Sequence, residues 1–151
     1  MDFVRCCACV GQRGEFILDE ALKMIAYSIS EDKKSILIEN SKILFEDEIN
    51  NVLVFPNVCV VHLTNIKCAS GKSSVNMWEQ PINNIYGIDS SGKILWNIKQ
   101  ITMSHLGEQI DDYYSGAAKL SNNILRVATF RGITLDIDIN SLDVVSKTFT
   151  R

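Results

Sequence analysis

The chain has 151 residues, of which 46% are hydrophobic, and a formal net charge of −3 at pH 7. This length suits a single domain over 1–151, and the composition is that of an ordinary globular protein. The mild acidity argues against nucleic-acid binding, which usually needs a basic face. No apolar run approaches the roughly 18 residues of a membrane span, and the N-terminal stretch lacks the apolar core of a signal peptide. We therefore expect a cytoplasmic protein that does not bind a membrane.

Residues 24–64 have the pattern of short strands joined by polar turns. Apolar residues alternate from Ile25 to Ile29, and "SEDKKS" then supplies a turn. The strands "ILIE" and "KILFEDEI" follow, and after them "NNVLVF" and "VCVVHL", which are separated by Pro56-Asn57. Proline cannot donate to a sheet ladder, so Pro56 is expected in the turn.

Two segments lack strand alternation, and we expect both to be long insertions. They are residues 64–82 and residues 99–121, the second with at most one helical turn. Between them, "NNIYGIDSSGKILWNI" (83–98) predicts a strand, a tight turn at Gly92 and a second strand.

The C-terminal residues predict a three-stranded meander. Its strands are "ILRVATF", "ITLDIDI" and "DVVSKTF", with turns at Arg131-Gly132 and at 140–142. In the middle strand, Ile133, Leu135, Ile137 and Ile139 share one face, which we expect to be buried, while polar residues share the other.

A faint internal repeat consists of "IENSKILF" (38–45), "IDSSGKILW" (88–96) and "IDINSLDVV" (137–145). Its acids, Glu39, Asp89 and Asp138, each precede a polar turn and a β-rich strand. The segments "NNILRVATFRGITLDIDINSLDVV" and "NNIYGIDSSGKILW" resemble blade repeats of the quinoprotein-type β-propellers. The chain is too short for the family's closed ring, so we expect no quinone and no other cofactor. The expected fold is all-β, with antiparallel meanders in two or three stacked sheets that form an incomplete propeller or a sandwich.

Cysteine and histidine supply the few candidates for catalysis or metal binding. Cys6 and Cys9 have CxxC spacing, which can bind zinc or cycle as a dithiol, but a second ligand pair at matching spacing is missing. We interpret them as buried strand thiols, and His62 as a strand residue with a bonded ring nitrogen. His105 is close in sequence to Glu108, Asp111 and Asp112 and is the candidate general base. A small thiol- or histidine-dependent enzyme, or a metal-binding sensor, is therefore the alternative to a binding protein.

Acidic and aromatic residues gather at three places, which we interpret either as solvated turns or as a partner-binding surface. Tyrosine and tryptophan are enriched at interfaces, and carboxylates speed the encounter with a basic partner. The candidate residues are Glu46, Asp47 and Glu48, then Trp78 and Glu79, and finally Asp111, Asp112, Tyr113 and Tyr114.

The function expected from this pattern is non-enzymatic protein binding. A compact acidic sheet protein of this kind resembles the immunity proteins of bacterial contact-dependent growth inhibition systems. That resemblance implies a cognate protein toxin as the partner, a basic nuclease for example, which is bound and blocked in the cytoplasm. An interaction module derived from a propeller is a further alternative.

Overall fold

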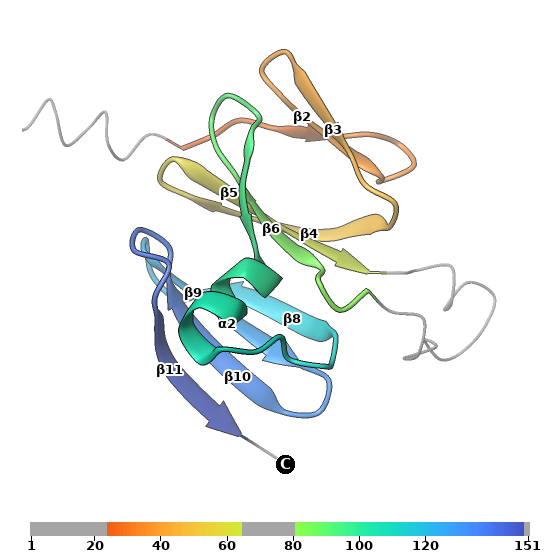
Figure 1. The fold of residues 1–151 in the computed structure, drawn as a ribbon. Coiled ribbons are helices and arrows are strands. Elements are labelled where there is room, and N and C mark those ends of the chain that lie inside the picture. The colour runs from red at the N-terminus through yellow and green to blue at the C-terminus, as the bar shows by residue number, and fades with distance from the viewer. Residues whose placement is uncertain (1–23, 65–80, 150–151) are drawn as a thin grey trace, which may run out of the picture.

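The computed structural model describes residues 24–64 and 81–149, which form three antiparallel sheets and are mostly β. The sheets follow one another through the molecule, from the first at the top of Figure 1 to the third at the bottom. In each sheet, strands that are consecutive in the sequence pair with one another. The predicted all-β fold of antiparallel meanders is confirmed.

In residues 24–64, 83–98 and 124–149 the strands lie near their predicted positions, except that "KILFEDEI" is divided between two strands, Ser41–Leu44 and Glu48–Phe55. The first sheet consists of β1 (Ser28–Ile29), β2 (Ser35–Ile38) and β3 (Ser41–Leu44). The second consists of β4 (Glu48–Phe55), β5 (Val58–Thr64), β6 (Ile85–Ile88) and β7 (Ile94–Asn97). The third consists of β8 (Tyr114–Lys119), β9 (Ile124–Thr129), β10 (Ile133–Asp138) and β11 (Val144–Phe149). Helix α2 (Ile98–Leu106) follows β7 directly.

The second sheet is the middle layer and is covered on both faces. In β5, Val58 and Val60 belong to a core shared with the third sheet, whereas Cys59, Val61 and Leu63 belong to a core shared with the first. These two cores correspond to the two faces of one strand, because successive side chains point to opposite sides. The molecule is therefore a stack of three layers around β5.

The third sheet buries the face that the sequence predicted. Leu135 and Ile137 are fully buried and pack with Leu125 and Val127 of β9. On the other face of β10, Asp136 receives two hydrogen bonds from the guanidinium of Arg126, at 2.8 and 2.9 Å. The alternation in "ITLDIDI" is thus confirmed.

The repeat identified in the sequence marks the turn of one hairpin in each sheet. Glu39 lies between β2 and β3, Asp89 between β6 and β7, and Asp138 at the end of β10. The carboxylate of Asp89 accepts the backbone N–H groups of Ser91 and Lys93 at 2.9 and 3.0 Å. Asp138 Oδ1 likewise accepts backbone N–H groups of its own turn, so such bonds explain the aspartate at these two positions.

A close approach of two strands explains the glycine in "NIYGIDSSGKILW". Gly87 of β6 is opposite Trp96 of β7, and an added Cβ would lie 2.2 Å from the indole ring. Only glycine leaves room for the indole to lie across its neighbour, and Trp96 is then 3% exposed.

The prediction that residues 99–121 are an insertion was wrong. The segment contains most of α2 and all of β8, which pairs with β9 along its whole length. Asn97 and Gln100 form a capping box at the start of α2, and Gly107 ends the helix with φ 77°. The strand β8 has the sequence "YSGAAK", whose small residues have weak β propensity, so pairing with β9 determines its conformation.

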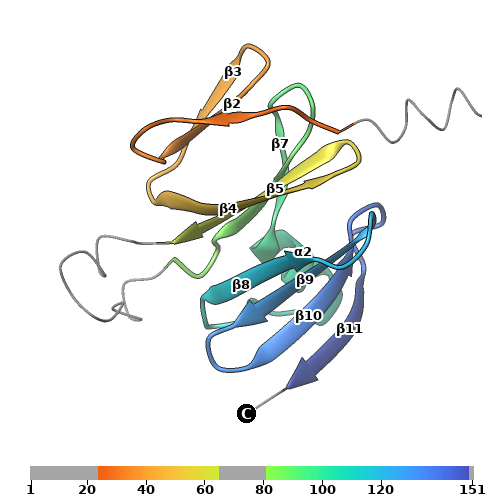
Figure 2. The same ribbon diagram turned by 180° about the vertical axis from the view of Figure 1, so that it is seen from behind.

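Buried polar groups join the middle sheet to the third sheet. His62 Nε2 lies 2.6 Å from the carbonyl oxygen of Tyr114, and Asn84 Nδ2 donates to the same oxygen at 3.0 Å. Because a carbonyl can only accept, His62 carries its proton on Nε2, and Nδ1 is left to face the amide of Asn50 at 3.4 Å. Figure 2 shows β8 beneath β4 and β5 at this junction. The predicted role of His62 as a bonded strand residue is confirmed.

The alternation in β10 predicts unequal costs for two adjacent substitutions. Leu135→Ala removes a fully buried side chain, and we expect a loss of about 2–5 kcal/mol in the free energy of unfolding. Asp136→Ala removes only a pair with the half-exposed Arg126, and we expect about 1 kcal/mol or less. Urea unfolding of both variants measures the difference, and equal losses would contradict the register of β10.

The burial of His62 is expected to make the protein less stable in mild acid. Burial lowers its pKa, and the bond to the carbonyl of Tyr114 opposes this only in part. Below an unfolded pKa of about 6.5, the unfolded chain binds a proton that the folded chain does not, so stability falls as pH decreases toward the folded pKa. We expect a slope of up to about 1.4 kcal/mol per pH unit below about pH 6.5, which ends at the lowered folded pKa.

The variant His62→Gln keeps an N–H donor for Tyr114 but cannot titrate. We expect its free energy of unfolding, measured by urea titration at several pH values, to lose this slope. His105→Gln is the matched control, because the His105 side chain is 30% exposed and lies outside the junction. An unchanged slope in His62→Gln would show that another group titrates.

Candidate functional site

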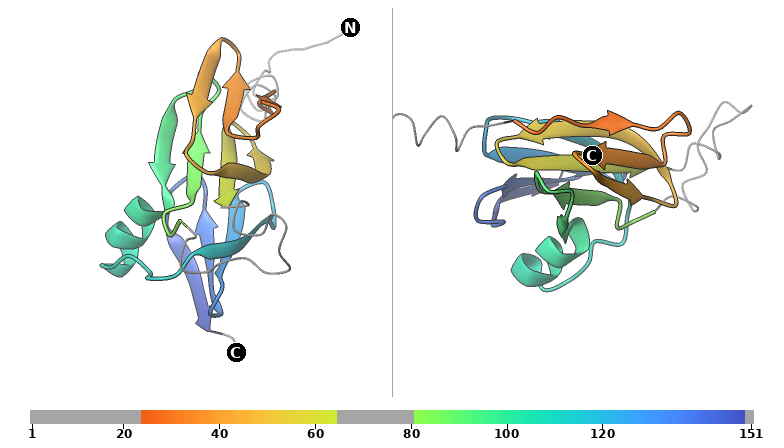
Figure 3. Two further views of the ribbon diagram at one scale, coloured as in Figure 1. Left: turned by 90° about the vertical axis from the view of Figure 1, so that its right-hand side faces the viewer. Right: turned by 90° about the horizontal axis from the view of Figure 1, so that it is seen from above.

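The predicted carboxylates that the structure describes lie at one end of the stacked sheets. Glu48 begins β4 and pairs with Thr64 at the end of β5, and Asn84, just before β6, bonds to Tyr114 at the start of β8. Figure 3 (left) looks onto this end, where the link from β3 to β4 and the segment before β8 both lie. We call it the acidic end, and its carboxylates are Glu46, Asp47, Glu48, Asp111 and Asp112.

An aromatic pair stands beside the carboxylates that precede β8. The rings of Tyr113 and Phe130 stack with centroids 5.6 Å apart and planes 19° apart, and Phe130 is 50% exposed. Two hydrogen bonds hold the segments that carry the pair. Phe130 N donates to Tyr113 O at 3.1 Å, and Arg131 N donates to the side-chain Oδ2 of Asp112 at 2.7 Å. Burial and the charge of Asp112 raise the pKa of the Tyr113 phenol, so it remains a neutral donor.

Phe130 was not among the residues predicted from the sequence. It follows β9 directly and precedes the turn at Arg131-Gly132. A large aromatic residue at the first position of a polar turn is a signal that could have identified it, because turns seldom need apolar bulk.

Tyr114 does not belong to the surface that the sequence predicted. It is 2% exposed and packs in the core between the second and third sheets. Burial, and secondarily the charge of Asp112, raise the pKa of its phenol far above the ordinary value. Tyr114 is the first residue of β8, and its alternation with Tyr113 places one ring inside and the other outside.

The other acidic cluster borders a cleft. Glu46 is exposed, whereas Asp47 and Glu48 are half-buried. A cleft of about 390 Å³ opens beside Glu46 and Asp47, and its apolar lining includes Phe45 and Tyr86. The carboxylates therefore stand at the mouth of an apolar depression, which the sequence did not indicate.

Four predicted residues lie outside the described part of the chain: Cys6, Cys9, Trp78 and Glu79. Cys59 is described, and it is a fully buried thiol in the core between the first and second sheets. Burial raises the pKa of this thiol to about 11, so it stays protonated and unreactive at neutral pH.

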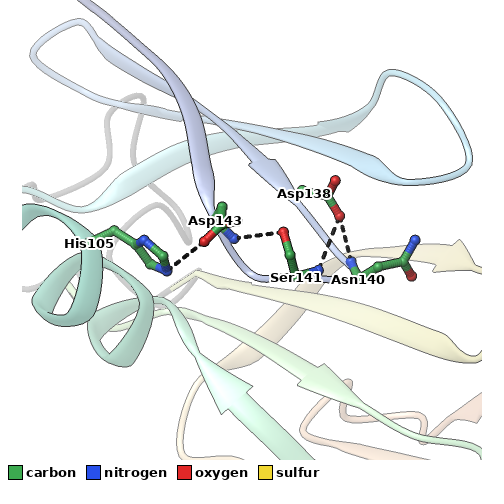
Figure 4. Close-up of polar contacts among 5 residues, drawn as sticks. All are labelled: His105, Asp138, Asn140, Ser141 and Asp143. Carbon is green, nitrogen blue, oxygen red and sulfur yellow. Dashed lines mark hydrogen bonds and ion pairs between the residues drawn. The ribbon is translucent and has the colours of Figure 1, made fainter.

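His105 has a different carboxylate neighbour from those predicted. It lies at the end of α2 with Nε2 3.4 Å from Asp143 Oδ1, a carboxylate from the turn before β11 (Figure 4). The hydroxyl of Ser141 accepts from Asp143 N at 3.3 Å and does not face the imidazole. The same loop is held by Asp138 Oδ1, which accepts the N–H groups of Asn140 and Ser141 at 2.8 and 3.2 Å. These bonds hold the turn before β11 against α2 and bring no nucleophile to the histidine.

Within residues 24–64 and 81–149, no group of three or more His, Cys, Asp or Glu side chains is arranged to hold a metal ion. The helix described in the same ranges is too short and too polar to cross a bilayer.

Comparison with known proteins places the chain in a family. A search of curated proteins finds no match. A family model described as a domain of unknown function, DUF7957, matches residues 24–149, which include all the strands that the structure describes, the acidic end and α2. The chain belongs to the DUF7957 family.

Proposed function

We propose that this chain is a non-enzymatic protein-binding protein whose acidic end binds a basic protein. The observation that carries the proposal is the stack of the half-buried Tyr113 on the exposed Phe130, beside the carboxylates of Asp111 and Asp112. Aromatic side chains supply large contact areas at interfaces, while carboxylates around them attract a basic surface and orient it.

The rigidity of the stack supports a role in recognition. Hot-spot residues are effective when binding does not have to immobilise them, because each rotamer fixed on binding costs about 0.5–1.5 kcal/mol. The rings of Tyr113 and Phe130 already restrict each other, and Asp112 is held by the backbone N–H of Arg131. A partly exposed aromatic pair whose rings already pack on each other is therefore suited to anchor a partner.

In its finer form, the proposal is that the chain is a bacterial immunity protein that blocks a cognate toxin in the cytoplasm. A nuclease toxin carries a basic surface for its own nucleic acid, and an acidic protein that covers this surface would inhibit it by charge and by bulk. The acidic end has both elements, carboxylates and an apolar anchor. The proteins encoded beside this chain's reading frame are the first partners to test.

Substitutions at the acidic end are expected to affect the association rate and the dissociation rate separately. Asp111→Asn with Asp112→Asn removes two charges yet leaves an amide oxygen for the N–H of Arg131, so we expect a lower association rate with a weaker salt dependence. Tyr113→Ala removes half of the aromatic stack, so we expect faster dissociation. The loss of binding free energy is expected to be about 2 kcal/mol or more. Stopped-flow binding at two salt concentrations measures both rates.

Glu39→Gln with Asp143→Asn is the matched control, since it removes two charges from hairpin turns at the opposite end of the sheets. We expect this control to leave both rates nearly unchanged, and thermal melting to show that all variants remain folded. Rates that respond equally to the control and to the acidic-end variants would contradict the proposed site.

A further inference from the structure

The cleft at the acidic end combines aromatic and aliphatic walls. The rings of Phe45 and Tyr86 lie with centroids 5.4 Å apart and planes at 45°. Leu63 is buried in the lining, whereas Leu44 and Ile94 are 73% and 41% exposed. Side chains from β3, β5, β6 and β7 thus meet in one depression. Two of them, Leu44 and Ile94, remain exposed to solvent at its edge.

Two negative charges border these walls. Glu46 and Asp47 line the cleft directly after Phe45, and among the described residues no lysine, arginine or histidine lines it. Both carboxylates line the same cleft as Tyr86, and burial and then the charges of Asp47 and Glu46 raise the pKa of its phenol. A cation placed here would be attracted by both carboxylates and would lie near the aromatic faces.

We propose that this cleft binds an arginine side chain of the partner protein. The aliphatic stem of an arginine can pack on Leu44 and Ile94 while its guanidinium stacks on Tyr86 and bonds to Glu46 and Asp47. Arginine fits better than lysine, because a planar guanidinium stacks on aromatic rings and presents several donors to carboxylates at once. A cleft of about 390 Å³ is at the small end of ligand sites, which suits one long side chain.

The inference deepens the proposed function and rests on it for the identity of the protein that carries the arginine. The cleft itself can be tested without that protein. The probe is the peptide Ac-Gly-Arg-Gly-NH₂, titrated into the ¹⁵N-labelled full chain and followed by amide chemical shifts. For one side chain we expect a dissociation constant of about 1–10 mM, with the largest shifts at Phe45, Asp47 and Tyr86.

Two further peptides test the chemistry of recognition. Citrulline has the shape of arginine without its charge, and we expect the citrulline peptide to bind at least about tenfold more weakly. We expect the lysine peptide to bind at least about threefold more weakly than the arginine peptide, because lysine lacks the planar donor group. Equal binding of citrulline or of lysine would overturn the proposal, as would the absence of shifts at the cleft.

Matched variants show where the charge acts. Glu46→Gln with Asp47→Asn is expected to weaken the arginine peptide about tenfold, whereas Asp111→Asn with Asp112→Asn changes the same net charge outside the cleft and is expected to alter affinity by less than about twofold. Equal effects of the two double variants would overturn the cleft as the binding site. The amide spectrum of each variant reports whether it is folded.

Failure of this inference is distinguishable from failure of the proposed function. If the peptide does not bind but substitution of Asp111 and Asp112 slows association with the partner, the arginine site is overturned and the proposed function stands. If the arginine peptide binds at the cleft and no basic partner is bound by the chain, the arginine site stands and the proposed function is overturned.

Discussion

The burial of strand β5 on both faces is the constraint on which the rest of the structure depends. Val58 and Val60 face one core while Cys59 and Val61 face another, and all four are buried. A strand that is apolar on both faces is stable only when a layer covers each face, because otherwise one row of side chains would remain in water. The short first sheet is therefore as necessary as the larger third sheet for covering the middle layer. It supplies Ile36 and Ile38 to the second core, although it contributes only three strands.

Burial of the middle layer also explains the polar junction beside it. The carbonyl of Tyr114 at the start of β8 would be orphaned next to the middle sheet, and His62 and Asn84 both bond to it. A buried acceptor without a partner costs about 1–3 kcal/mol, so these two side chains determine how β8 can lie against β5. The bonds are directional, unlike the contacts among Val, Leu and Ile, and they fix the register between the two layers. The register of β8 against β9 then places Tyr113 beside Phe130.

The sequence identified those elements whose local signals agree with their tertiary environment. The alternation from Ile133 to Ile139 and the aspartate turns both depend on near neighbours, and they were predicted correctly. Strand β8 could not be predicted this way, because Gly116, Ala117 and Ala118 have little strand preference and their conformation comes from pairing with β9. The capping box of Asn97 and Gln100 is also a local signal, and it marks the start of α2. For the candidate site, the sequence identified the acidic clusters and Tyr113. It could not show that Phe130 stacks on that ring, since this pairing depends on the hairpin register.

The two surfaces proposed for recognition belong to different layers, and this has a physical consequence. The stack of Tyr113 and Phe130 belongs to the third sheet, whereas the cleft beside Tyr86 is formed by the first and middle sheets. Their separation is therefore set by the packing of β5 and by the bonds to Tyr114, and it is fixed on folding rather than on binding. A partner that contacts both surfaces binds only the folded chain, in which the three sheets are stacked. Its binding free energy therefore adds to the stability of the native state. Side chains that are already held by contacts within the protein lose less entropy on association. The same interactions that bury the middle sheet thus position the residues that we propose for recognition.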